Sequence, residues 1–457
     1  MTRVSKASRS SKGAREPEGT ERRESSSPAV ADGDLSGGLA ALVVAATLFG
    51  VLLAVDTRAE SAFDSIKTVV AHGGAVLATS LLLAGGPGPA RSMRSLPPVL
   101  RIAAFLAVTG AGLALLSAVF ATRPAASLDA LRSAALTALL VPLGASRAFD
   151  SGRILLPVAG FLAGVSANSV ASVLQAAGLV KLFDVVQITG RANTGAFLGN
   201  EGYVALVAAL AVPVGAGCVA VTRGRVRWLA GAALVLALAA LAANPSLTAL
   251  AAATTGLGGY LYFGAPSRIR RRAIGAFLAV AAVLPLVPAA RARLADLAYH
   301  VRSRNLEALL SYRAGPWAAA MEMTREHPLL GVGPGGFESR FVPARLAAEQ
   351  RLRRSFVAES AAGSYAQAHS DFLQAPAELG LPAAAALTAS FALLLVGLRG
   401  RIRATSSPEP AVLLGVLAAG FVAALAWFPM QRALTAAPLL LAVGRAARLS
   451  AVQDPEK

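Results

Sequence analysis

The residues best suited to acid–base chemistry lie in a polar stretch near residue 370. His369 is followed by Asp371 two positions later, and Glu378 follows within the same stretch. A neutral imidazole beside a carboxylate can accept a proton near pH 7. The pattern makes His369 a candidate general base, with Asp371 and Glu378 as candidates to orient its ring. The alternative is a histidine that only makes a hydrogen bond at a helix end.

The candidate base ends a long segment, residues 291–372, that carries more arginine than acidic residues. The planar guanidinium group donates two parallel hydrogen bonds that match a phosphate. The composition favours an anionic substrate, although some of the arginines are expected to pair with glutamates such as Glu322. His-x-Asp alone is a weak metal signature, and Cys218 is the single cysteine. We therefore expect no metal site and no cofactor.

The elements that must position these residues are apolar helices. The chain has 457 residues, of which 55% are hydrophobic and 15% are charged. Ala, Leu and Val recur in blocks of roughly 18–22 residues, which is long enough for a helix to cross a bilayer. We predict an all-α polytopic integral membrane protein with about 12 transmembrane helices. The predicted spans are 35–55, 66–86, 98–121, 128–146, 154–178, 201–221, 228–243, 246–263, 273–290, 383–398, 411–428 and 432–448.

Charge in the short loops gives the orientation. If the N-terminus is cytoplasmic, the short cytoplasmic loops hold most of the loop arginines, as the positive-inside rule requires. The net charge of +18 is thereby explained without a nucleic-acid partner. We expect an inner (plasma) membrane protein with both termini cytoplasmic, a membrane domain over 35–448, and a large periplasmic loop, 291–372, between the ninth and tenth spans. Residues 1–34 form a disordered tail, and 449–457 form a second cytoplasmic tail.

Two local patterns refine this picture. Asn168, Ser172 and Gln175 share one face of the fifth span. They either line a wet cavity or bond to neighbouring helices, and we favour the second because nearby glycines allow close approach. Gly380-Leu381-Pro382 predicts a helix break with Pro382 in the first turn of the tenth span. Residues 370–379 are then a separate helix at the membrane interface.

The polar motifs resemble a known family. His327-Pro328 begins a Gly-rich phrase that ends at Phe337, and it is followed by Ala368-His369-Ser370-Asp371 and Glu378-Leu379-Gly380-Leu381. This order looks like the signature of the O-antigen ligase and O-antigen polymerase superfamily. The segment from Gly190-Arg191 to Asn200, the twelve spans and the large outer loop fit the same resemblance.

The resemblance implies a function and site residues. Members of this superfamily transfer a glycan from an undecaprenyl-diphosphate carrier to an acceptor hydroxyl without a metal. By this similarity His369 matches the catalytic histidine, and Arg191 and Arg313 match arginines that engage the diphosphate. His327 is expected to be structural. The implied partners are the lipid-linked donor, membrane lipid, and an acceptor that is either lipid A core or another glycan.

One departure and two alternatives remain. Family members often carry a Ser-Arg pair near the start of the eighth span, where this chain has Ser246-Leu247. Either another arginine such as Arg340 supplies that charge, or the donor differs, or activity is lost. The sequence leaves ligase and polymerase open, and a transporter or flippase of lipid-linked sugars is the alternative of another class.

Overall fold

The computed structural model consists of α-helices and short 3-10 turns joined by loops. It describes residues 29–59, 61–85, 96–150, 152–183, 194–268, 270–271, 291, 295, 298–303, 306–310, 312–356 and 365–452. No strand occurs among these residues. The predicted ninth span, 273–290, lies outside the described part of the chain, as do residues 1–28 of the N-terminal tail. The first helix, α1 (Ala29–Leu53), begins within the tail predicted over 1–34.

Long apolar helices make up most of the molecule. Nine candidate membrane spans are found among the described residues by length and composition. They comprise α1, α2 (Ser65–Ala84), α3 (Pro98–Val119), α4 with α5 (Pro124–Ala138 and Leu140–Ala145), α6 (Leu155–Ala176), α7 (Glu201–Val221), α8 (Gly224–Ala243), α16 (Leu381–Ala404) and α17 (Glu409–Ala426). The chain is a polytopic membrane protein, and twelve spans remain a prediction.

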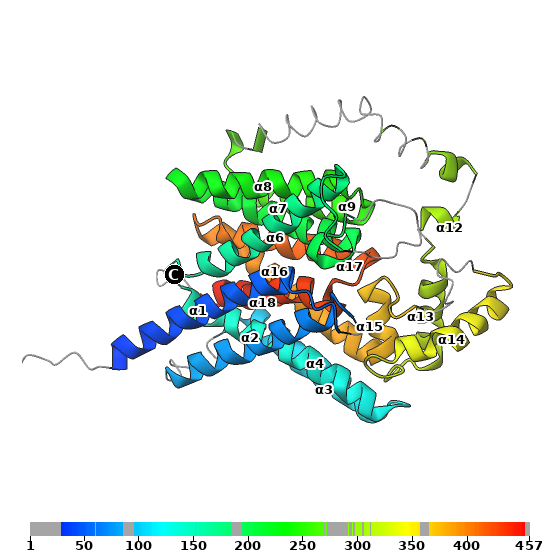
Figure 1. Ribbon diagram of the computed structural model, residues 1–457. Helices are drawn as coiled ribbons and strands as arrows, with labels where there is room; N and C mark the ends of the chain where they lie inside the picture. The colour runs from blue at the N-terminus through cyan, green and yellow to red at the C-terminus, as the bar shows by residue number, and fades with distance from the viewer. Residues whose placement is uncertain are drawn as a thin grey trace, which may run out of the picture.

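Two further helices lie where spans were expected. They are α9 (Leu247–Gly264) and α18 (Ala433–Ser450), each of 18 residues. The bundle is built around α7, since 67% of the residues in its most apolar stretch are buried. This helix packs on α6, α8, α9 and α17, while α16 packs on α3 and α1 packs on both α2 and α6. Figure 1 shows the long helices lying side by side as one body.

Glycines let α1 and α6 pack closely. A Cβ atom added to Gly160 would collide with the backbone of Ala45, and one added to Gly164 would lie 2.9 Å from Leu52 Cδ1. In an apolar solvent helices associate through such close packing and through hydrogen bonds rather than by excluding water. Small residues at this contact therefore support the bundle, as the sequence indicated.

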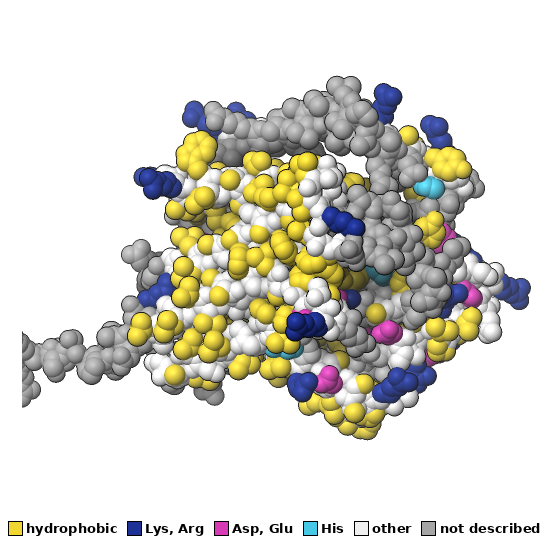
Figure 2. Space-filling view, viewed as in Figure 1, with side chains coloured by type: hydrophobic (Ala, Val, Ile, Leu, Met, Phe, Trp, Pro, Cys, Tyr) yellow, Lys and Arg dark blue, Asp and Glu magenta, His cyan; other side chains and the backbone are white. Residues whose placement is uncertain are grey.

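A smaller group of helices covers one end of the bundle. It contains α12 (Leu306–Leu309), α13 (Ala314–Glu326), α14 (Phe337–Leu352) and α15 (Asp371–Leu379). Figure 1 shows α13, α14 and α15 together beyond the ends of the long helices. In Figure 2 the visible flank of the bundle is mostly hydrophobic, whereas charged side chains gather over α13 and α14. The predicted break is confirmed: α15 ends at Leu379, Gly380 has φ 82°, and Pro382 lies in the first turn of α16.

Candidate active site

The Gly-rich phrase after His327 folds back onto the end of α15. Gly331, Gly333 and Gly335 have φ of 66°, 99° and 70°, which a glycine adopts without strain. The Val332 N–H donates to Ala377 O, and the Gly333 N–H donates to Glu378 O, both at 2.9 Å. A side chain at position 331 would run into this backbone. Gly331 is therefore required by the close contact between loop and helix, while Gly333 and Gly335 leave no room for a side chain against residues 121–130.

Glu378 fastens this loop from the inside. Its side chain is 6% exposed, and Oε1 accepts hydrogen bonds from the Phe337 N–H at 3.2 Å and Gln374 Nε2 at 3.1 Å. Burial raises the pKa of Glu378. Its backbone oxygen also accepts from Ser117 Oγ of α3 at 2.9 Å. Glu378 thus joins the start of α14, α15 and the bundle.

His369 lies just before α15, in a left-handed backbone conformation with φ 55°. Ser370 next to it caps the helix, because Ser370 Oγ accepts from the Leu373 N–H at 3.4 Å. The Asp371 N–H donates to Trp427 O at 3.1 Å. These bonds fix His369 between the end helices and the segment that joins α17 to α18.

The imidazole ring is enclosed by aromatic side chains. Its centroid lies 5.7 Å from that of Tyr365, 5.6 Å from that of Trp427 and 4.9 Å from that of Phe428, in edge-on arrangements. Its Nδ1 atom is buried and has no hydrogen-bond partner among the residues that the structure describes. Burial, followed by the charges of Arg313 and Arg432, lowers the pKa of His369 to about 4. The ring is therefore neutral at pH 7 and can accept a proton.

Two guanidinium groups lie over the neighbouring rings. The Arg313 group is 5.1 Å from the Trp427 centroid, and the Arg432 group is 5.5 Å from the Phe428 centroid. Trp427 and Phe428 stack with centroids 5.2 Å apart. Arg432 also pairs with Asp64 at 2.8 Å. The site thus combines one neutral base with two cations in an environment that excludes much of the water.

The predicted site residues do not all meet here. His369 and Arg313 do, whereas Arg191 lies outside the described residues. Arg340 donates to Thr122 Oγ1 at 2.7 Å, and none of its contacts within the described chain reaches His369. The second charge that acts on His369 is that of Arg432, and a role of Arg340 in diphosphate binding stays a prediction.

The two carboxylates that were predicted to orient the imidazole ring have other hydrogen-bond partners in the structure. Asp371 Oδ2 accepts from the Met430 N–H at 2.9 Å and fixes the turn before Arg432. Burial raises the pKa of Asp371 to about 7. Glu378 is committed to Phe337 and Gln374, as described above. Among the described residues, neither side chain is hydrogen-bonded to the ring. Asp371 at the start of α15 and Glu378 in its last turn both point toward other partners.

Arg432 was missed by sequence reasoning, which treated it as the first residue of the twelfth span. The available signal was its place after Trp427-Phe428-Pro429, since an arginine beside aromatic residues at a helix end is suited to cation–π contact. His327 follows the last residue of α13 and is exposed, and its structural role stays a prediction.

The polar face of α6 supports the same end of the bundle. Asn168 Nδ2 donates to Leu52 O at 2.9 Å, and Gln175 Oε1 accepts from the Ala196 N–H at 2.8 Å. Ser172 Oγ accepts from Asn244 Nδ2 at 2.7 Å. The interpretation as hydrogen bonding between segments is confirmed for this stripe.

The described architecture is that of a helical membrane protein with a His–Arg site at one end of the bundle. A family model described as O-antigen ligase matches residues 232–388, a region that contains Arg313 and His369. This match confirms the resemblance to the O-antigen ligase superfamily over residues 232–388. No curated protein matches the chain.

Proposed function

We propose that the protein transfers a glycan from an undecaprenyl-diphosphate carrier to an acceptor hydroxyl. The observation that carries the proposal is the neutral imidazole of His369 beside the guanidinium groups of Arg313 and Arg432. The O-antigen ligase family match supports a membrane glycosyltransferase at the level of class.

His369 acts as the general base in this mechanism. The bond between the anomeric carbon of the donor sugar and the diphosphate oxygen breaks, and a bond from that carbon to the acceptor oxygen forms. The acceptor hydroxyl proton passes to the imidazole. Positioned general bases contribute roughly 10²- to 10⁴-fold to such reactions.

The arginines stabilise the leaving group. The departing diphosphate gains negative charge as the bond breaks, and fixed guanidinium groups in a partly desolvated site favour that charge. Arg313 and Arg432 are in place for this role, and Arg191 is proposed as a third participant on the strength of the resemblance. A diphosphate is already a good leaving group, so the mechanism requires no metal.

The test is transfer by the purified protein, supplied with polyprenyl-diphosphate-linked glycan, an acceptor glycan and excess EDTA. Wild-type protein should form product and release the carrier diphosphate, while His369→Asn should not. His327→Ala is the matched control and should retain transfer, because that histidine is exposed at a helix end. Full activity of His369→Asn would exclude His369 as the general base. Loss of wild-type activity in EDTA would overturn the metal-free reaction.

Ligase and polymerase differ only in the acceptor. Mass spectrometry of surface glycans from a deletion strain separates them: a missing ligase leaves long glycans on the carrier, whereas a missing polymerase leaves single repeats on the final acceptor. Accumulation of donor on the inner leaflet would instead indicate a flippase.

A further inference from the structure

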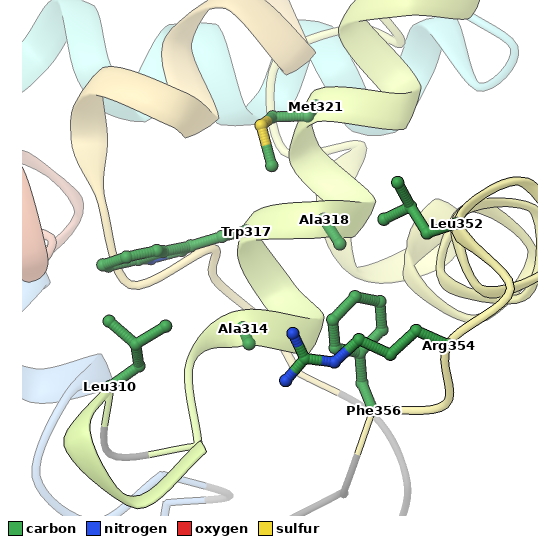
Figure 3. A pocket seen from close by; sticks show the side chains of 8 residues that line it. All are labelled: Leu310, Ala314, Trp317, Ala318, Met321, Leu352, Arg354 and Phe356. Atoms are coloured by element: carbon green, nitrogen blue, oxygen red, sulfur yellow. The ribbon is translucent and has the colours of Figure 1, made fainter. Parts of the chain in front are cut away.

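A pocket of about 350 Å³ lies on α13 one turn beyond Arg313. Figure 3 shows Trp317 and Leu310 on one side, Phe356 and Arg354 on the other, and the small side chains of Ala314 and Ala318 between them. The two alanines keep the space between the aromatic rings open. The remaining lining residues are Met321 and Leu352.

The walls of the pocket are braced from three segments. The Phe356 N–H donates to Glu349 Oε1 at 2.9 Å, and Glu349 is held by Arg345 at 3.1 Å. Arg354 pairs with Glu307 at 3.0 Å, and its guanidinium group lies 5.4 Å from the Phe356 centroid. Arg354 and the backbone of Phe356 are therefore held in place by other residues.

Two buried polar atoms of this region have no hydrogen-bond partner among the described residues. They are the donor Trp317 Nε1, which belongs to a lining residue, and the acceptor Glu307 Oε2, which belongs to the ion-pair partner of the lining residue Arg354. Buried polar atoms are normally hydrogen-bonded, so each such exception requires an explanation. A ligand that carries both donors and acceptors, and that shifts the side chains slightly on binding, would satisfy both atoms.

The pocket combines apolar and charged groups that suit a carbohydrate. Trp317 and Phe356 offer flat apolar faces, while Arg354 in the lining, together with its partner Glu307, offers charged hydrogen-bonding groups. A sugar ring has a face of C–H groups and an edge of hydroxyl groups, which matches this combination. Ligand sites usually have this form, with apolar walls and a few placed polar groups, at volumes from about 300 Å³ upward. The helices that form the pocket are not among the candidate membrane spans of the described chain.

We propose that the pocket lined by Trp317, Arg354 and Phe356 is a glycan subsite that binds a sugar removed from the reacting hydroxyl. The inference rests on the proposed transfer reaction, because Arg313 at the start of the same helix turn reaches the reaction site. Binding energy from such a remote sugar strengthens binding of longer glycans and leaves the chemical step to His369.

The test compares substrates of different length. Trp317→Ala should raise the KM for a multi-sugar substrate by roughly 10-fold, which corresponds to the loss of one aromatic contact. The KM of this variant for a single-sugar analogue, and its kcat for the multi-sugar substrate, should stay within about two-fold of the wild-type values. A raised KM for the donor assigns the pocket to the donor glycan, and a raised KM for the acceptor assigns it to the acceptor. Arg354→Gln should give the same pattern without removing a buried ring.

A second measurement does not depend on transfer. Free oligosaccharide released from the donor or the acceptor should change the intrinsic fluorescence of the wild-type protein. The change should be lost in Trp317→Phe and kept in Trp228→Phe, because Trp228 is 82% exposed on α8. If the protein binds glycan through Trp317 but catalyses no transfer, the proposed function is refuted while the glycan subsite is supported. Unchanged KM values for both long substrates in Trp317→Ala and Arg354→Gln would overturn the subsite.

Discussion

Donor binding should raise the pKa of His369. The pKa is lowered to about 4 by burial and then by the charges of Arg313 and Arg432. A bound diphosphate places negative charge beside both guanidinium groups and offsets their effect on the ring. The protonated form of His369 becomes more favourable, so the imidazole is a stronger base in the donor complex than in the free protein.

The two pKa values of His369, in the free protein and in water, set an upper limit on how far donor binding can raise its pKa. The pKa lies at about 4 against an ordinary value of 6.5, so full recovery would be worth about 3 kcal/mol. Burial persists when donor is bound, so the rise must be smaller than this. The acid limb of kcat/KM reports the free protein and should have its midpoint near pH 4, whereas the limb of kcat should lie at higher pH.

Initial rates of transfer between pH 3.5 and 8 provide the measurement. Arg432→Gln removes one of the two charges and should move the kcat/KM limb to higher pH. Arg340→Gln is the matched control, because Arg340 bonds to Thr122, and it should leave the limb in place. If the acid limb of kcat has its midpoint at the same pH as that of kcat/KM, or at a lower pH, donor binding does not raise the pKa of His369 and the electrostatic coupling is refuted.

Three further outcomes follow from particular contacts. Arg313→Ala should abolish transfer and Arg313→Lys should restore only part of it, because a point charge lacks the bidentate geometry; equal activity of both variants would contradict this. Glu378→Ala should lower stability by roughly 1–3 kcal/mol, since the Phe337 N–H loses its acceptor, whereas Glu378→Gln should be close to wild type in thermal unfolding. In a Cys218→Ser background, Leu346→Cys, which replaces a side chain that is 49% exposed, should react with an impermeant thiol reagent in whole cells and Ser267→Cys should not. Labelling of position 267 alone would reverse the orientation.

The apolar spans were predictable because membrane helices carry their signal locally, in length and hydropathy. The break before α16 was predictable for the same reason, since Gly380 and Pro382 restrict the backbone at their own positions. His369 and Arg313 were predicted as site residues from the resemblance of their motifs to a family, not from any geometry that the sequence encodes. The partners of Glu378 and Arg432 could not be read from the sequence, because Phe337 and Asp64 approach them only through tertiary packing. Aromatic and arginine residues 56 or more positions from His369 along the chain complete its surroundings, and no local pattern encodes that distance.

The left-handed backbone at His369 has a consequence for how this sequence can change over evolutionary time. Histidine, asparagine and aspartate enter the left-handed region more readily than other non-glycine residues, so φ 55° restricts this position to a small set of residue types. Within that set only histidine both packs its ring edge-on against Tyr365, Trp427 and Phe428 and can accept a proton near pH 7. A lineage released from selection for transfer should therefore replace the histidine mainly by asparagine or aspartate, while the glycines of the adjoining loop, which packing requires, persist.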